Sequence, residues 1–489
     1  MEGTKMPFSK DKPYEVNLYG NAKGNQGQPF FVSNMGRYIW CEDPFTFRIE
    51  GGEINSTSEF SDIELGQAGN TMKEAFLSAG RKFFPSNGKI PDTLLFVRPQ
   101  YNTWIELMYD QNQNDVLKYA VDIVDNDFPT GVLMIDDNWQ IDYGNWEFNP
   151  SKFADPKAMC DRLHNMGFKI MLWVCPFVSP DCEIYRSLRE RKLLLTSVEN
   201  PREPAIVRWW NGYSALLDLS NPEAMKWFID QLKRLQSEYG IDGFKLDGGD
   251  VNYYANTKSF QNIHINTQME LYARVGLDFS LNEYRACWKL AGQPLVQRLR
   301  DKSCTWTDVQ KLIPDMMALS MMGYAYGCPD LIGGGEFGSF LNNPDIDQEL
   351  VVRSAQVHAL MPMMQFSVAP WRIMDKEHLA AAKKAAYLHV QFKEVILTLA
   401  KKSSVTGEPI VRPLEYNFPH QGFSEIKDQF MLGDDILVAP VVVSGQRSRQ
   451  VLLPRGKWID ETGKKINGGK TIIVDVPIDR VPYFKRAGK

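Results

Sequence analysis

The sequence predicts an α/β protein: a (β/α)₈ TIM barrel flanked by an N-terminal β-sandwich and a C-terminal antiparallel β domain. Between about residues 93 and 401, short apolar runs alternate with amphipathic helical segments about eight times. On either side of this region, short alternating runs are separated by Gly, Asn and Pro instead. No G-x-G-x-x-G turn follows an early strand, which disfavours a doubly wound nucleotide-binding sheet.

Residues 1–92 are predicted to form the β-sandwich domain. The runs Arg37–Cys41 and Phe45–Ile49 alternate in polarity, and turn residues such as Glu50–Glu53 interrupt them. The segment Pro85–Pro91 is predicted to lead from this domain into the barrel.

The barrel is predicted over residues 93–401. Its expected strands are Leu94–Val97, Gly131–Ile135, Lys169–Val174, Ala215–Asp218, Gly243–Asp247, Asp278–Leu281, Ser303–Trp306 and Tyr324–Tyr326. Helices are expected near residues 156–165, 182–193, 222–238, 316–322, 346–360 and 376–399. In such a barrel the carboxyl ends of all strands meet at one mouth, where catalytic residues lie.

Residues 402–489 are predicted to form the C-terminal β domain. The runs Asp435–Pro440, Arg449–Leu453 and Thr471–Asp475 alternate with Gly, Asn and Pro turns, as in an antiparallel sheet.

Bulk composition excludes several classes of function. The net charge of −5 and the pI near 5.8 give no basic surface for nucleic acid or for an anionic membrane. Seven scattered cysteines without a C-x-x-C pair predict neither a zinc site nor a disulfide framework. The N-terminus has no apolar signal region, which fits a cytoplasmic protein or a periplasmic or secreted one without its leader. The composition does not decide whether the chain forms a homo-oligomer.

Acids and aromatic residues gather where the predicted strands end. The acids are Asp136, Asp137, Asp218, Asp247, Asp250, Glu283, Asp301 and Asp330. Beside them stand Trp104, Trp173, Trp209, Trp210, Lys245, Arg285 and Trp306. The six histidines fall mostly in predicted helices, and no G-x-S-x-G elbow occurs. Acids with aromatic rings suit glycoside hydrolysis, which needs one carboxylate as nucleophile or base and another as proton donor.

Several motifs together resemble glycoside hydrolase family 31. They are Trp173–Phe177, Arg208–Gly212, Gly243–Asp247, Pro329–Gly334, Met363–Ser367 and Asp435–Pro440. Within the family, Ile135–Asp137 and Val207–Gly212 are most similar to the subgroup that contains a myogenesis-regulating glycosidase and bacterial α-galactosidases. The resemblance covers most of the chain from about residue 95 onwards and implies the same three-part architecture.

The resemblance implies a retaining mechanism. Asp247 matches the family's nucleophile, and Asp301 matches its acid/base. The two carboxyl groups should then lie roughly 5–5.5 Å apart. Asp301 is expected to have a raised pKa, because it must carry a proton when the substrate binds.

The resemblance also implies the substrate-binding residues Asp136, Asp137, Trp173, Trp210, Lys245, Arg285 and Trp306. The two acids would accept sugar hydroxyls at O4 and O6. The three tryptophans would form apolar walls. Arg285 would bind hydroxyls and keep Asp247 ionised. The substrate would be an oligosaccharide or another glycoside, and neither a cofactor nor a metal is expected.

Two departures from the family's α-glucosidases indicate a different sugar. Those enzymes carry Trp-x-Asp-Met-Asn-Glu around the nucleophile, where this chain has Lys245–Asp250. They also carry Arg-Asn-His after a late strand, where this chain has Gln365–Val368. With the tandem Asp136 and Asp137, these changes favour an exo-acting α-galactosidase. An α-glucosidase or α-xylosidase, a metal-dependent barrel lyase and an inactive sugar-binding protein are the alternatives.

Overall fold

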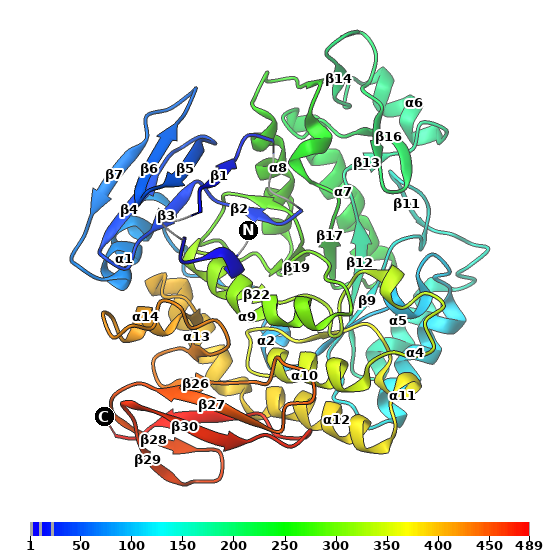
Figure 1. Cartoon of the computed structure of the whole chain (residues 1–489). Helices are drawn as coiled ribbons and strands as arrows, with labels where there is room; N and C mark the ends of the chain where they lie inside the picture. Colours follow the sequence, from blue (N-terminus) through cyan, green and yellow to red (C-terminus); the bar gives the residue numbers. More distant parts are fainter. Residues whose placement is uncertain (1–2, 9–11, 21–23, 489) are drawn as a thin grey trace.

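A computed structural model describes residues 3–8, 12–20 and 24–488 of the chain. At its centre is an eight-stranded sheet in the order β22-β21-β19-β17-β12-β9-β8-β23, with all neighbouring strands parallel. The strands are β8 (Gln100–Asn102), β9 (Val132–Ile135), β12 (Lys169–Val174), β17 (Gly243–Leu246), β19 (Leu281–Tyr284), β21 (Gln297–Arg298), β22 (Gly327–Cys328) and β23 (Gln365–Phe366). Ile332 N, shortly after β22, donates to Gln365 O in β23 at 2.8 Å. This contact links the two ends of the sheet, and the predicted barrel is confirmed (Figure 1).

Helices surround the barrel, and helix α7 (Pro222–Tyr239) shows how the sequence forms them. Asn221 caps its first turn by accepting from Glu223 N, and Gly240 ends it in the left-handed conformation at φ 81°. Its buried side chains recur every three or four residues and face the strands: Ala224, Phe228, Leu232 and Leu235. The other long helices after β8 are α4 (Gln113–Asp125), α5 (Pro156–Asn165), α6 (Glu183–Glu190), α8 (Ile265–Arg274), α9 (Trp306–Met321), α10 (Gln348–His358), α12 (Lys376–Gln391) and α13 (Lys393–Thr406).

Two small antiparallel sheets precede the barrel. One contains β1 (Tyr14–Asn17), β5 (Thr46–Glu50) and β6 (Glu53–Thr57), and the other β3 (Phe30–Val32), β4 (Arg37–Trp40) and β7 (Glu64–Gln67). Phe31 and Phe47 meet between them with ring centroids 4.2 Å apart. Helix α1 (Met72–Phe83), begun by a capping box at Thr71 and Glu74, then leads towards the barrel.

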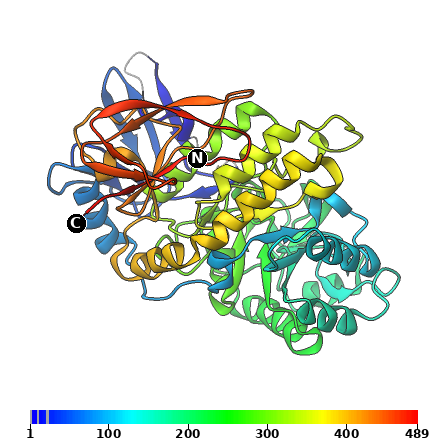
Figure 2. The same ribbon diagram turned by 90° about the horizontal axis from the view of Figure 1, so that it is seen from below.

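The chain ends in two further antiparallel sheets. The six-stranded one contains β24 (Val411–Arg412), β25 (Phe430–Leu432), β26 (Ile436–Val438), β28 (Lys457–Asp460), β29 (Lys465–Asn467) and β31 (Tyr483–Arg486), and the smaller one β27 (Ser448–Leu453) and β30 (Lys470–Asp475). In both orientations the N-terminal and C-terminal strands lie to the same side of the barrel (Figures 1 and 2). Among the described helices, none has the length and apolar character needed to cross a bilayer.

Several predicted elements differ from the structure. Leu94–Val97 is a helical turn, α2, because the Asp92 carboxylate accepts from Leu94 N at 2.9 Å and starts it. Ala215–Asp218 overlaps β16 (Gly212–Leu216), which pairs antiparallel with β13 (Phe177–Val178) outside the barrel. The strands predicted at residues 303–306 and 324–326 are instead β21 and β22, which lie a few residues away. The domain boundary predicted at residue 402 falls within α13 and stays a proposal.

Candidate active site

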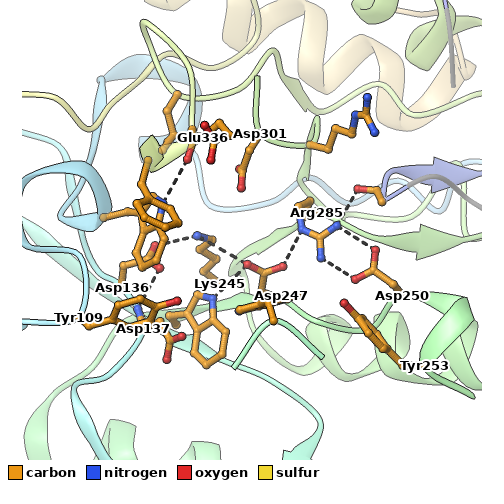
Figure 3. Close-up of a pocket in the computed structure, with 18 residues that line it drawn as sticks. Tyr109, Asp136, Asp137, Lys245, Asp247, Asp250, Tyr253, Arg285, Asp301 and Glu336 are labelled. Carbon is orange, nitrogen blue, oxygen red and sulfur yellow. Dashed lines mark hydrogen bonds and ion pairs between the residues drawn. The ribbon is translucent and has the colours of Figure 1, made fainter. Parts of the chain in front are cut away.

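A cavity of about 570 Å³ lies at the carboxyl ends of the barrel strands (Figure 3). Its polar wall comes from residues that directly follow strands, as in other barrels. Eight of the nine residues predicted from the sequence line it: Asp136, Asp137, Trp173, Trp210, Lys245, Arg285, Asp247 and Asp301. Figure 3 shows Asp247 and Asp301 facing the same space from opposite walls.

The ninth predicted residue, Trp306, does not line this cavity. It is the first residue of α9, whose start is fixed by the Thr305 side chain accepting from Asp308 N. The Trp306 indole donates to Asp347 at 2.8 Å on the protein surface. Since Ser303–Trp306 is a helix cap rather than a barrel strand, its last residue is directed away from the mouth.

Asp247 follows β17 and is held by three hydrogen-bond donors. Arg285 Nε and Gly248 N reach Oδ1 at 2.8 and 2.9 Å, and Trp173 Nε1 reaches Oδ2 at 3.1 Å. Lys245 Nζ lies 3.9 Å from Oδ2. Burial raises the pKa of Asp247, but the charges of Arg285 and Lys245 outweigh burial and hold this pKa well below its ordinary value. The carboxylate is therefore ionised across the physiological range.

Arg285 is fixed independently of Asp247. It binds both oxygens of Asp250, through Nη1 at 2.9 Å and Nη2 at 2.5 Å. Nη1 also donates to Gly24 O at 2.8 Å, from the N-terminal segment. Among the described residues, partners are found for four of the five guanidinium N–H groups, and the fifth can bind a ligand. The Trp210 ring stands 5.5 Å from the guanidinium carbon, and 46% of that residue's surface is exposed.

The interior of the barrel below Asp247 is polar. In the sheet, Lys245 is level with Trp173 on one neighbouring strand and with Glu283 on the other. Lys245 Nζ donates to Asp136 Oδ2 at 2.7 Å. Burial lowers the pKa of Lys245, but Asp136 more than offsets this and the net shift is upward. Among the described residues, no cluster of three or more His, Cys, Asp or Glu is placed to hold a metal ion.

Asp137 lies beside Asp136 in a hydrogen-bond network that sequence reasoning missed. Its carboxylate accepts from Asn211 Nδ2 at 2.6 Å and from Tyr143 Oη at 3.2 Å. Asn211 Oδ1 in turn accepts from Tyr109 Oη at 2.8 Å, and Tyr109 lines the cavity. Burial, followed by the charge of Asp136, raises the pKa of Asp137 to about 7. Near neutral pH, Asp137 can therefore donate or accept a hydrogen bond.

Asp301 and Asp330 share one guanidinium nitrogen. Arg298 Nη1 donates to Oδ1 of each carboxylate at 2.7 Å. Burial raises the pKa of Asp301, but Arg298 and Lys245 outweigh burial and the net shift is downward. Burial raises the pKa of Asp330 to about 7 against the opposing charge of Arg298, and the charge of Asp301 adds to the rise. The raised pKa expected at Asp301 is thus found at Asp330 instead.

Asp330 is held in an uncommon backbone conformation. Its backbone φ of 148° is one that residues other than glycine rarely adopt. Its Oδ2 accepts from Lys302 N at 2.7 Å and from Gly335 N at 3.1 Å, so its carboxylate also fixes the chain around Asp301. Strain of this kind persists where surrounding contacts over-determine the geometry, often at functional sites. The Pro329–Gly334 motif was the sequence signal for this residue.

The N-terminal segment reaches the same site through Gln26. Strand β2 (Gln26–Gly27) pairs with β20 (Cys287–Trp288). The buried Gln26 side chain donates from Nε2 to the carbonyl oxygens of Arg285 and Arg298, each at 2.7 Å. One amide thereby joins the backbones of the two arginines that bind Asp247 and Asp301.

Replacing Gln26 by Leu should lower the free energy of unfolding by about 1–3 kcal/mol, because two buried carbonyl groups lose their donor. Chemical denaturation monitored by tryptophan fluorescence measures this. Gln28→Leu is the matched control, since Gln28 is similarly buried and neither of its side-chain polar atoms has a partner among the described residues. Equal denaturation midpoints for Gln26→Leu and the parent protein would contradict this stabilising role of the two Gln26 hydrogen bonds.

Comparison with known proteins agrees with this architecture. Residues 98–291 match the glycosyl hydrolases family 31 TIM-barrel domain, and residues 407–489 match the family's C-terminal domain. Myogenesis-regulating glycosidase of Mus musculus is 35% identical over 420 residues, which cover 83% of this chain and 58% of that protein. This chain belongs to glycoside hydrolase family 31.

Solved structures of family 31 share the fold. A GH31 α-xylosidase from a soil metagenome, complexed with xylose, has a TM-score of 0.84 at 22% identity over 97% of this chain and 75% of its own. The GH31 dextranase of Flavobacterium johnsoniae, complexed with glucose, has a TM-score of 0.85 at 20% identity over 98% of this chain and 64% of its own. The chain spans about half the length of the curated relatives it matches.

Proposed function

We propose that this chain is a retaining, exo-acting α-glycosidase with Asp247 as nucleophile and Asp301 as acid/base. The observation that carries the proposal is the pair of carboxylates on opposite walls of one cavity, with Asp247 held ionised by Arg285 and Lys245. A retaining glycosidase needs an ionised nucleophile and a second carboxyl group that carries a proton. Membership of family 31 supports the same assignment.

In the first step, Asp247 attacks the anomeric carbon, and Asp301 gives the leaving oxygen the proton that it shares with Asp330 across Arg298. The bond from carbon to the leaving oxygen breaks, and a glycosyl–Asp247 ester forms. Asp247 then loses its charge, but Arg285 stays in place because Asp250 binds it through two hydrogen bonds. In the second step, Asp301 takes a proton from water, which displaces Asp247 and releases a sugar of unchanged anomeric configuration.

The inner end of the cavity supports an exo-acting enzyme that cuts off one terminal sugar. Asp136 and Asp137 are only 2% and 3% exposed and close this end with charged groups that a longer chain could not pass. Asp136 is neutralised by Lys245, whereas Asp137 retains oxygen atoms for a hydroxyl group.

We propose galactose as the terminal sugar. The adjacent acids Asp136 and Asp137 both line this cavity, and such neighbouring carboxylates suit an axial O4 next to the C6 hydroxyl. Lys245 and Gly248 occupy positions where the family's α-glucosidases have bulkier residues or different contacts. The runner-up is an α-glucosidase or α-xylosidase, because the similar structures were solved with glucose and xylose.

An aryl α-galactoside should be hydrolysed with a kcat/KM at least about 100-fold higher than the matching α-glucoside and α-xyloside. Sites built to hydrogen-bond a hydroxyl group discriminate at least this strongly when it is lost or moved. Steady-state kinetics with the three p-nitrophenyl glycosides measures the ratio, and NMR of the first-formed anomer checks retention. Brisk α-glucoside turnover without α-galactoside turnover would reassign the sugar.

Full activity in a chelator would exclude the metal-dependent lyase.

A further inference from the structure

A second cavity, of about 490 Å³, adjoins the candidate active site. It is bounded by β14 (Thr196–Ser197), β15 (Val207–Trp209) and the 3₁₀ turn η2 (Val251–Tyr254). The half-buried Tyr253 lines both cavities, so the two spaces adjoin at this residue. In Figure 3 this ring stands beside Asp250, at the edge of the site.

The strand β15 runs from one cavity to the other. Trp210, just after the strand, lines the first cavity, and Arg208 lines the second. Arg208 lies within β15, and Trp210 lies in the tight turn that connects β15 to β16, so one hairpin contributes to both cavities. Trp209 between them points into the core and stacks on Phe177 at 4.1 Å. The β15–β16 hairpin therefore borders both cavities.

The second cavity presents polar groups that the protein itself does not use. Within the described part of the chain, the side chains of Arg208, Glu199 and Asn256 have no hydrogen-bond or ion-pair partner. Arg208 and Glu199 carry opposite charges and do not pair with each other. Val198 and Ile206 add exposed apolar surface, at 46% and 45%. Balanced charges, amide groups and an adjacent aromatic ring suit a neutral polyhydroxyl ligand better than an anion or a peptide.

We propose that this second cavity binds a distal sugar unit on the leaving-group side of a neutral oligosaccharide whose terminal sugar occupies the first cavity. The proposal rests on the proposed function. Tyr253 supplies an apolar face for a sugar ring, and Arg208 and Glu199 bind its hydroxyl groups. The enzyme is then an oligosaccharidase that gains affinity from chain length, and not one adapted to small aryl or alkyl glycosides.

The test compares kcat/KM for p-nitrophenyl α-galactoside with α-galactosyl-terminated di-, tri- and tetrasaccharides. In the parent protein, kcat/KM should rise at least about 10-fold between the di- and tetrasaccharide, because the longer chain adds hydrogen bonds in the second cavity. Arg208→Ala with Glu199→Ala should abolish this rise and change aryl glycoside hydrolysis less than twofold. Arg202→Ala, at an exposed arginine outside both cavities, is the matched control.

Each outcome decides between the two proposals. Aryl α-galactoside turnover without any gain from chain length would overturn the distal site and leave the proposed function intact. Turnover of α-glucosides or α-xylosides alone would overturn the sugar assignment, and the same length series in that sugar then tests the distal site. If no glycoside is hydrolysed, saturation-transfer NMR with the tetrasaccharide decides: contacts unchanged by the double variant would refute the site.

Discussion

Replacing Asp247 by Ala should lower kcat/KM for every accepted glycoside by at least about 10⁴-fold, as the loss of a covalent nucleophile does elsewhere. The covalent intermediate cannot form without this carboxylate. The fold should persist, because Arg285 keeps Asp250 and Lys245 keeps Asp136 as ionic partners. Initial rates with an activated aryl glycoside measure the loss, and thermal unfolding checks the fold.

Added azide provides the chemical control for Asp247→Ala. A small anion can enter the space left by the carboxylate and attack from the same side, which yields a glycosyl azide of inverted configuration and restores part of the rate. Asp250→Asn is the matched variant. Asp250 binds Arg285 on the side away from Asp247, so this variant should lose less activity than Asp247→Ala. A loss of only a few fold in Asp247→Ala would show that another residue is the nucleophile.

Replacing Asp330 by Asn should move the alkaline limb of the kcat/KM profile to lower pH by at least about one unit, which is a loss of activity of about fivefold at pH 7 and about tenfold above pH 8. Asp301 and Asp330 both accept from Nη1 of Arg298, and the pair retains one proton up to about pH 7. Asp301 donates this proton to the leaving oxygen. The proton is held below that pH and released above it. Without the negative charge of Asp330, Arg298 keeps Asp301 ionised at lower pH.

The substrate's leaving group separates this effect from simple damage to the fold. An aryl glycoside with a strongly acidic phenol leaves without a proton, so Asp330→Asn should hydrolyse it nearly as fast as the parent protein. Asp308→Asn is the control, because Asp308 binds Lys311 and Ser303 N outside the cavity and should not move the limb. Equal losses with both leaving groups, or an unmoved alkaline limb, would refute the shared-proton role.

The barrel was predictable where its strands are long. β9, β12 and β17 are four to six residues long and almost wholly buried, and the sequence placed all three. The exception is β19, which was expected at residues 278–281 and spans Leu281–Tyr284. The later strands β21, β22 and β23 have only two residues each, too few to show a period. This is why residues 303–306 were mistaken for a strand, and why Trp306 was assigned to a cavity wall that it does not reach.

The sequence by itself determined the order of the elements, the family and the position of Asp247, because apolar periodicity and local motifs are written along the chain. Only the tertiary structure decided which acid carries the raised pKa. Arg298 and Asp330 are joined by the register of β21 with β22, where Arg298 is level with Cys328. The pKa depends on burial and on charges a few ångströms away, and the fold brings both from distant parts of the sequence.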